Sequence, residues 1–389
     1  MNILTVTTLY PNEKQFRHGV FIETRLRHLV QTGEIKARVV APVPWFPFKG
    51  DLFKQYAVYA DVPKFENRHG IDIFHPRYLV IPKIGMLFTP FFMAISLYFQ
   101  IKQLNKRNKI DLIDAHYFFP DGVAVTLVNK LLKTPFIISA RGTDINLIPE
   151  YKIPRKMILW AAEQAQASVT VCKALKDSMI EMGAEEEKIH VYRNGVDLDL
   201  FRLLDKQQCI EKYQLNKKTL VSVGHLIERK GHHLVIEAMQ SLPNYQLLIV
   251  GGGEEEKPLK ALVKTLNLSK QVTFLGEKKQ QDLTEIYNAA DAMVLASSRE
   301  GWANVLLESM ACGTPVVATN IWGTPEVVQN IDAGVLVKRT SEAIAQGVNK
   351  LFEHYPLRTS TRKYAEQFSW DSTTLGLLNL FKKINKVII

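Results

Sequence analysis

Residues 298–315 read SREGWANVLLESMACGTP and follow directly on a short apolar run, Ala292–Leu295. The apolar run is typical of a parallel strand that is covered on both faces. The quoted stretch predicts a loop and then a helix over Asn304–Ala311, which Gly313 ends. A strand, a loop and a helix in this order predict part of a doubly wound α/β sheet, in which ligands bind at the carboxyl ends of the strands.

The loop and the helix carry groups that suit a phosphorylated sugar. The first helical residues, Asn304, Val305 and Leu306, present amide groups and the positive end of the helix dipole to a phosphate. Glu300 in the loop can reach sugar hydroxyls, and Glu308 can accept both hydroxyls of a ribose through its two oxygens. The alternative makes Glu308 a solvated helix residue, but its helix is largely apolar, and an acid in such a helix needs partners.

Apolar runs with the character of buried strands recur along the whole chain. They are Ile3–Thr7, Arg38–Ala41, Leu112–Ala115, Phe136–Ser139 and Ser168–Val171 in the first half, and Leu220–Val223, Leu247–Val250, Val272–Leu275, Ala292–Leu295 and Val316–Ala318 in the second. Amphipathic stretches separate them, which predicts a doubly wound sheet that occurs twice. A chain of 389 residues also suits two domains, and we place them at residues 1–190 and 191–371.

The cysteines and the first residues of the chain indicate in which cellular compartment the protein works. Cys172, Cys209 and Cys312 form no CxxC pair and no metal spacing, so neither a disulfide framework nor a zinc framework is expected. The opening residues MNILTVTTLYP resemble a strand and not a secretory signal. Both features predict a cytoplasmic protein.

Basic residues concentrate in the first half of the chain. Residues 1–180 contain 24 Lys+Arg and 14 Asp+Glu, a net charge of +10, whereas residues 181–389 contain 25 of each and account for none of the total of +10. This asymmetry predicts that the first half faces something anionic. The alternative is a scatter of solvated lysines.

One uncharged run, Ile84–Ile101, is 18 residues long and reaches the length threshold for a membrane span. Its position inside an α/β pattern favours a core helix instead. The run is followed by Lys102, Lys106, Arg107 and Lys109, and an apolar face next to basic residues also suits binding to an anionic membrane surface. Both interpretations hold if one side of the helix, with Phe88, Phe91 and Phe92, reaches the surface. The protein would then be peripheral at the inner face of the plasma membrane.

Several motifs of the chain, taken together and in order, resemble one enzyme family. They are YPNEKQFRHGVFIE (10–23), AHYFFPDG (115–122), SARGTDIN (139–146), RNGVDLDLF (193–201), VGHLIERKGHHLVIEAM (223–239), the pair Glu300 and Glu308 with GTPVVAT (313–319), and WGTPEVV (322–328). The chain resembles the retaining family-four glycosyltransferases of the GT-B fold, and among them the bacterial surface-polysaccharide enzymes of the teichuronic-acid type. The resemblance covers nearly the whole chain.

The resemblance implies two Rossmann-like domains that face each other across a cleft, with a C-terminal helix over 372–389 that crosses back to the first domain. It implies that the second domain binds a nucleotide-diphosphate sugar. The first domain would bind the acceptor, which we expect to be a glycan or a sugar on a lipid carrier. The family retains the anomeric configuration of the donor sugar.

Further site residues follow from the resemblance in the second half. Lys230 and Arg229 are expected to contact the donor diphosphate and to stabilise it as it leaves. His225 stands where the family carries an arginine, and a neighbouring phosphate would favour its charged form. The alternative for Lys230 is a solvated loop lysine.

In the first half, the resemblance places His116 beside the reacting sugar on the acceptor side. Asp144 and Arg141 are expected to orient acceptor or sugar hydroxyls, and Gly19 is expected to let backbone amides approach a phosphate. The alternatives are a buried structural role for His116 and a capping role for Asp144.

No cofactor and no metal are expected. Asp197 and Asp199 form a DxD pattern, but it lies in a turn that the family carries without using it for metal. The run Gly251–Gly253 lacks the third glycine of a dinucleotide fingerprint. The alternative functions are a nucleotide-sugar epimerase or a phosphorylase of the same fold. A protein of another class, which binds an anionic surface through its basic half, is a further alternative; nucleic acid is not an expected partner.

Overall fold

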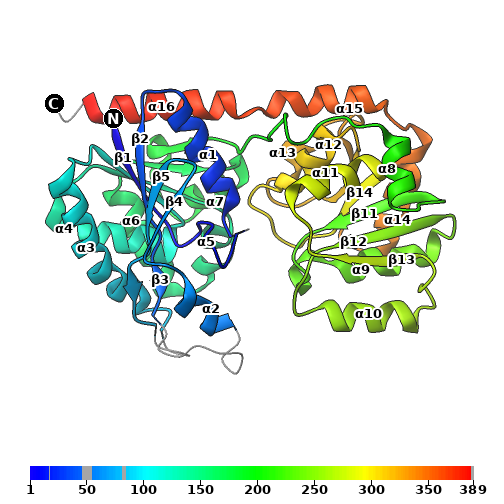
Figure 1. The fold of residues 1–389 in the computed structure, drawn as a ribbon, viewed down its shortest axis with the longest axis horizontal. Coiled ribbons are helices and arrows are strands. Elements are labelled where there is room, and N and C mark those ends of the chain that lie inside the picture. Colours follow the sequence, from blue (N-terminus) through cyan, green and yellow to red (C-terminus); the bar gives the residue numbers. More distant parts are fainter. Residues whose placement is uncertain (17, 46–54, 81–84, 387–389) are drawn as a thin grey trace. The chain divides into compact units, whose positions relative to one another are not determined.

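The computed structural model describes residues 1–16, 18–45, 55–80 and 85–386. The chain divides into two compact units (Figure 1). The N-terminal unit comprises Met1–Arg193 and Asp371–Ile389, and the C-terminal unit comprises Asn194–Trp370.

The N-terminal unit contains an eight-stranded sheet in the order β10-β9-β8-β7-β1-β2-β5-β4, in which only the β4–β5 pair is antiparallel. The strands are β1 (Asn2–Val6), β2 (Lys36–Val40), β4 (Phe65–Arg68), β5 (Ile71–Phe74), β7 (Leu112–His116), β8 (Phe136–Ser139), β9 (Ala167–Thr170) and β10 (Ile189–Val191), with β3 (Val43–Pro44) and β6 (Arg77–Tyr78) forming a separate pair. The helices are α1 (Val20–Gln31), α2 (Gln55–Asp61), α3 (Thr89–Arg107), α4 (Val123–Leu132), α5 (Thr143–Asn146), α6 (Lys152–Gln164), α7 (Lys173–Glu181) and α16 (Trp370–Lys386).

The last helix completes the core of the N-terminal unit. Leu377, Phe381 and Ile384 of α16 repeat at helical spacing and are buried against Ile3 of β1 and Leu112 of β7. Burying a leucine or phenylalanine side chain stabilises a fold by about 1.5–3 kcal/mol. The helix that we expected near the C-terminus is present as α16. At Ser369 the chain leaves the helical conformation, and this residue separates α16 from a short turn over Glu366–Phe368. The end of the expected range, 387–389, lies outside the described residues.

The C-terminal unit contains a six-stranded, fully parallel sheet in the order β13-β12-β11-β14-β15-β16. The strands are β11 (Lys218–Val223), β12 (Tyr245–Val250), β13 (Val272–Gly276), β14 (Ala292–Leu295), β15 (Val316–Thr319) and β16 (Gly334–Val337). The helices are α8 (Lys206–Lys212), α9 (His232–Ala238), α10 (Glu256–Thr265), α11 (Gln280–Ala289), α12 (Asn304–Ala311), α13 (Thr324–Val327), α14 (Ser341–Glu353) and α15 (Arg358–Ala365). The strand order reverses between β11 and β14, and such a switch point is where doubly wound sheets bind ligands.

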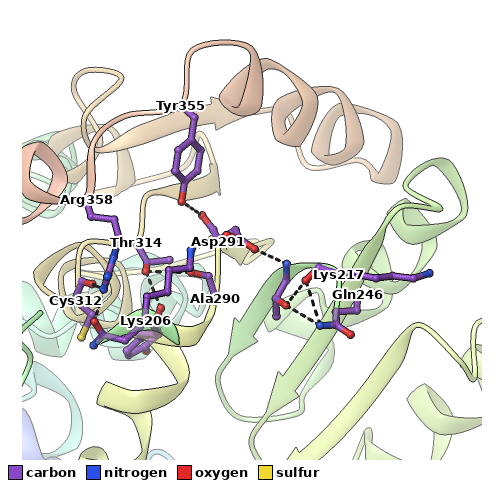
Figure 2. A network of polar contacts seen from close by, with 12 residues as sticks. Lys206, Lys217, Gln246, Ala290, Asp291, Cys312, Thr314, Tyr355 and Arg358 are labelled. Atoms are coloured by element: carbon purple, nitrogen blue, oxygen red, sulfur yellow. Dashed lines mark hydrogen bonds and ion pairs between the residues drawn. The ribbon is translucent and has the colours of Figure 1, made fainter. Parts of the chain in front are cut away.

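Polar contacts surround the amino-terminal ends of β11 and β14. The carboxylate of Asp291, just before β14, accepts the backbone amide of Thr219 at 2.7 Å and the ammonium of Lys206 at 2.6 Å. The hydroxyl of Tyr355 donates to the Asp291 carbonyl at 2.7 Å (Figure 2). The bond between Asp291 and Thr219 joins the starts of the two central strands, and the bonds from Lys206 and Tyr355 connect Asp291 to α8 and to the segment after α14.

The predicted fold class, α/β with two doubly wound sheets, is confirmed. Each of the ten apolar runs falls on a strand, and the helix predicted over Asn304–Ala311 has those bounds.

The long uncharged run is a surface helix of the N-terminal unit, although its first residue, Ile84, lies outside the described residues. One side of α3 packs inward, and the opposite side leaves Phe91, Ile95 and Phe99 exposed by 45%, 60% and 67%. Phe88, just before the helix, is also exposed, whereas Phe92, which we expected at the surface, is half-buried. Within the described ranges, no helix combines the length and the apolar character that crossing a membrane requires.

Candidate functional site

A cluster of opposite charges lies at the carboxyl ends of β11 and β14. The ammonium of Lys230, in the turn after β11, lies 2.5 Å from Oε1 of Glu300, in the loop after β14. The Arg229 guanidinium lies 3.8 Å from the other oxygen of Glu300, and the Ser297 hydroxyl donates to Oε1 at 2.6 Å. The structure therefore brings together three residues that the sequence predicted for one site.

Electrostatics keep this carboxylate ionised. Burial pushes the pKa of Glu300 upward, but the charge and hydrogen bond of Lys230, with smaller contributions from Ser297 and Arg229, bring it below its ordinary value. Only 10% of the Glu300 side chain and 16% of the Lys230 side chain are exposed, so the pair is only weakly screened by solvent. The cluster of Lys230, Arg229 and Glu300 carries one net positive charge, which suits an anionic ligand.

The two loops are also connected by hydrogen bonds to backbone carbonyl groups. The Ser298 amide donates to the Arg229 carbonyl at 2.8 Å, and the Arg229 guanidinium donates to the Arg299 carbonyl at 2.7 Å. Gly231 has a φ of +69°, and a Cβ there would lie 2.2 Å from the Ala296 carbonyl oxygen. Glycine at this position therefore lets the Lys230 turn pack against the end of β14.

Glu308 lies one turn inside α12, among buried residues of the same helix. The hydroxyl of Tyr287 donates to its Oε2 at 3.3 Å. Burial raises the pKa of Glu308 to about 7, and the bond from Tyr287 opposes this only in part. Glu308 is thus poised between its neutral and charged forms near physiological pH.

The start of α12 offers fewer free amides than expected. The Asn304 amide donates to the Trp302 carbonyl at 3.1 Å, and the Leu306 amide donates to the Ala303 carbonyl at 3.0 Å. Asn304 and Val305 are half-buried, and Leu306 is buried. A phosphate at this helix end would have to share these amides with the preceding turn.

His225 is exposed on the turn that follows β11. The adjoining Gly251–Gly253 run has a packing role, because a Cβ at Gly251 would lie 1.9 Å from the Gly224 carbonyl oxygen. A Cβ at Gly253 would lie 2.4 Å from the Leu226 carbonyl oxygen. The glycines therefore let this loop approach the His225 turn closely.

In the N-terminal unit, His116 ends β7 and is only 2% exposed. Its Nε2 lies 2.9 Å from Asp114 Oδ2, and its Nδ1 contacts the Arg141 guanidinium. Because arginine can only donate, we assign the proton to Nε2, which donates to Asp114, while Nδ1 accepts. Burial lowers the pKa of His116 to about 4. Both ring nitrogens are engaged, which favours the structural alternative for this residue.

Asp144 is buried at the start of α5, and its carboxylate accepts hydrogen bonds from backbone amides. Its carboxylate accepts the amides of Phe118 and Gly142 at 2.8 Å and of Arg141 at 3.0 Å. These bonds tie the loop after β7 to the loop after β8, and they favour the capping alternative.

Gly19 precedes α1 with a φ of +71°, and a Cβ there would lie 2.2 Å from the Leu9 carbonyl oxygen. The close approach of the chain itself therefore requires glycine here, whether or not a phosphate also approaches.

Sequence reasoning missed several buried polar residues in the N-terminal unit. Asp114 lies two residues before His116, so the same-face spacing on a strand was a readable signal. Arg25 on α1 is 1% exposed, and within the described part of the chain its guanidinium nitrogens meet no hydrogen-bond acceptor. Asp121 accepts the Thr8 hydroxyl at 3.1 Å, and burial raises its pKa to about 7. The burial of Arg25 and the contact of Asp121 with Thr8 become visible only in the fold.

The DxD pattern forms a turn. Oδ1 of Asp197 accepts the amides of Asp199 at 3.1 Å and Leu200 at 2.9 Å, which is an Asx turn. Over the described ranges, no group of three or more His, Cys, Asp or Glu side chains is arranged to hold a metal ion.

Comparisons with known proteins cover most of the chain. Residues 56–200 match the family described as "Glycosyltransferase Family 4", and residues 205–368 match "Glycosyl transferases group 1". The chain is 26% identical over 366 residues to the "Putative teichuronic acid biosynthesis glycosyltransferase TuaC" of Bacillus subtilis, an alignment that covers 91% of this chain and 90% of that protein.

Two solved structures are similar in fold. Sucrose-phosphate synthase of Thermosynechococcus elongatus matches with a TM-score of 0.83 and 18% identity, over 100% of both chains. Anabaena HepE in complex with UDP-glucose matches with a TM-score of 0.73 and 20% identity, over 98% of this chain and 100% of that chain.

Proposed function

The chain belongs to the family-4 glycosyltransferases of the GT-B fold, and on that premise we propose that it is a retaining enzyme whose donor is a nucleotide-diphosphate sugar. We propose as acceptor a hydroxyl group of a glycan or lipid-linked sugar in surface-polysaccharide biosynthesis, in the cytoplasm. The observation that carries the proposal is the Lys230–Glu300 pair at the switch point of the C-terminal sheet, beside the helix that bears Glu308.

The C-terminal unit offers one group of residues to the diphosphate of the donor and another to its ribose. The diphosphate would meet the cations of Lys230 and Arg229, which are adjacent in the chain and both pair with Glu300. The ribose would bind the Glu308 carboxylate, which accepts a hydrogen bond from Tyr287 and has the capacity to accept more. The HepE structure contains UDP-glucose, which makes a uridine nucleotide the first candidate.

The same groups serve the transfer step. As the bond between sugar and diphosphate breaks, negative charge grows on the diphosphate and the sugar gains oxocarbenium character. Fixed cations at the diphosphate lower this barrier, because they need no reorganisation during the reaction. The Glu300 carboxylate would accept hydrogen bonds from the hydroxyl groups of the sugar. The acceptor hydroxyl would attack the sugar carbon from the face at which the diphosphate leaves, and its proton would pass to the departing diphosphate oxygen, so that the configuration is retained.

A donor screen followed by a transfer assay tests the function. Nucleotide sugars, starting with UDP-glucose, should raise the melting temperature of the full chain; a ligand at a hundred times its Kd stabilises by about 2.7 kcal/mol. With the donor found, sugar should be consumed only in the presence of a glycan or lipid-linked hydroxyl acceptor. We expect turnover to persist in EDTA, and the product to keep the anomeric configuration by NMR.

Other outcomes would replace the proposal. Donor isomerised without an acceptor would indicate an epimerase, and turnover that requires inorganic phosphate would indicate a phosphorylase. Activity lost in EDTA and restored by Mg²⁺ or Mn²⁺ would assign a metal role to Asp197 and Asp199.

We also propose that α3 docks the N-terminal unit on the anionic inner leaflet. Phe91, Ile95 and Phe99 follow one another at spacings of four on its exposed side, and the exposed Lys102 and Lys106 continue that side at spacings of three and four. An apolar stripe that runs into basic residues suits interfacial binding. Each basic residue near the surface contributes about 1 kcal/mol, and salt screens this attraction.

Flotation with liposomes that contain phosphatidylglycerol tests the docking. The full chain should float at low salt and detach at high salt, and replacing Phe91, Ile95 and Phe99 by serine should abolish flotation. Leu357→Ser is the control, because Leu357 is 73% exposed in the C-terminal unit and should not matter. No flotation at low salt contradicts the docking, and release only by detergent would indicate insertion across the bilayer.

A further inference from the structure

Thr319 is a buried polar residue to which the mechanism above gives no part. It ends β15, and because Leu295 of β14 pairs with Ala318, it lies directly beyond the last pair of these two strands. From there its hydroxyl donates to the Ser297 carbonyl at 2.7 Å. The bond therefore connects the end of β15 to the start of the loop that carries Glu300.

Ser297 continues this connection to the ion pair of the candidate site. Its hydroxyl donates at 2.6 Å to Oε1 of Glu300, the oxygen that lies 2.5 Å from the Lys230 ammonium. Both Thr319 and Ser297 are buried, so water does not compete for these bonds, and hydrogen bonds are stronger in such surroundings. The series from Thr319 through Ser297 thus restricts where the Glu300 carboxylate can lie.

The preceding carbonyl is also bound from outside the loop. Nε of Arg339, after β16, donates to the Ala296 carbonyl at 3.0 Å. Buried carbonyls need donors, so both bonds have a role in folding. The Thr319 bond has a further consequence, because the residue that it holds, Ser297, also donates to Glu300.

We propose that Thr319 is a positioning residue of the site, which acts through Ser297 to hold the Glu300 carboxylate in place for the hydroxyl groups of the donor sugar. The inference rests on the proposed function, since it takes Glu300 as a group that binds this sugar. Thr319 needs no contact with the ligand. A small displacement of a group that orients the substrate is sufficient to slow transfer.

Two substitutions at Thr319 separate its hydroxyl from its shape. Valine keeps the shape without the donor, and serine keeps the donor. Thr319→Val should lower kcat by about threefold to tenfold, the effect of one hydrogen bond, with a smaller change in the KM of the donor. Thr319→Ser should restore kcat to within about twofold of the unaltered protein. Calorimetry with UDP, or with the diphosphate of the donor that the screen identifies, should show unchanged affinity, because this ligand lacks the sugar.

A double-variant cycle with Ser297→Ala tests the route. Ser297→Ala removes the bond to Glu300 and should also lower kcat by about threefold to tenfold. Adding Thr319→Val should then cost less than it does alone, because the side chain through which it acts is gone. Losses that multiply in full overturn the inference. Where Thr319→Val does not fold, Ser297→Ala decides, and a loss in kcat below about threefold overturns the inference.

Thr219→Val is the matched control for stability. Thr219 is a buried threonine at the amino-terminal end of β11, and its hydroxyl donates to the Lys217 carbonyl at 2.9 Å. This variant should lose stability much as Thr319→Val does, and it should keep its kcat.

Three results would overturn the inference alone. They are a loss in kcat below about threefold for Thr319→Val, a Thr319→Ser variant as slow as Thr319→Val, and a parallel loss of kcat and of UDP affinity. An unaltered protein that neither binds a nucleoside diphosphate nor transfers a sugar overturns the proposed function as well.

Discussion

Replacing Lys230 by alanine is expected to lower kcat by about a hundredfold or more, with a smaller effect on donor affinity. The expectation follows from its position: the Lys230 side chain is 16% exposed and lies with Arg229 at the carboxyl end of β11, where a leaving diphosphate would gain charge. Removing one preorganised donor of this kind typically raises a barrier by about 2.7–4 kcal/mol. The measurement is steady-state transfer with the donor found by the screen, and kcat and KM are reported separately.

The ion pair demands two controls. Lys230→Ala leaves the Glu300 carboxylate with Arg229 at 3.8 Å and Ser297, so thermal unfolding must show that the variant remains folded. The double variant with Glu300→Gln should lose less than the sum of the two single losses, because the two side chains are in contact. Lys270→Ala, at an exposed lysine before β13, should be fully active. A loss below about threefold in kcat for Lys230→Ala would make Lys230 a structural partner of Glu300 only.

Most of the strands that sequence reasoning found are buried along much of their length, although β2 and β13 are buried only in part. β8, β9, β14 and β15 are buried at every residue, so their sequences are short continuous apolar runs. β16 carries this signal in the run GVLV and was nevertheless missed, whereas three other missed strands lack it. β3 and β6 have two residues each, and β4 alternates between exposed and buried positions over four residues.

Some features of the candidate site could likewise be predicted from the local sequence, whereas others depend on contacts between distant parts of the chain. The loops of Lys230 and Glu300 could be placed at one sheet edge, because both follow parallel strands. Their direct contact across 70 residues could not be derived, since it depends on β11 lying next to β14. For His116, the contacts of both ring nitrogens come from Asp114 and Arg141, and the spacing of Arg141 along the chain gives no hint of this. Such residues become visible only when the fold is known.

Replacing Glu308 by glutamine is expected to weaken donor-nucleotide binding at pH 8 by about tenfold or more, because two hydroxyls lose hydrogen bonds to a charged oxygen. The same mechanism predicts a pH dependence in the unaltered protein. Burial holds the pKa of Glu308 at about 7, so the carboxylate that accepts both hydroxyls is lost as the pH falls below 7. Calorimetry with UDP between pH 6 and 8 should therefore show weaker binding at the acid end, and Glu308→Gln should remove that part of the change.

Stability should respond in the opposite sense. A carboxyl group whose pKa is raised in the folded state binds more protons than in the unfolded state, so it destabilises the fold as the pH rises from its ordinary value of 4.5 through about 7. Glu308→Gln should consequently melt at a higher temperature than the unaltered protein at pH 8, while binding nucleotide less well. Glu353→Gln, at an exposed glutamate that ends α14, should change neither property. Nucleotide affinity that is the same for Glu308→Gln and the unaltered protein would leave Glu308 as a half-buried partner of Tyr287, with no part in the donor site.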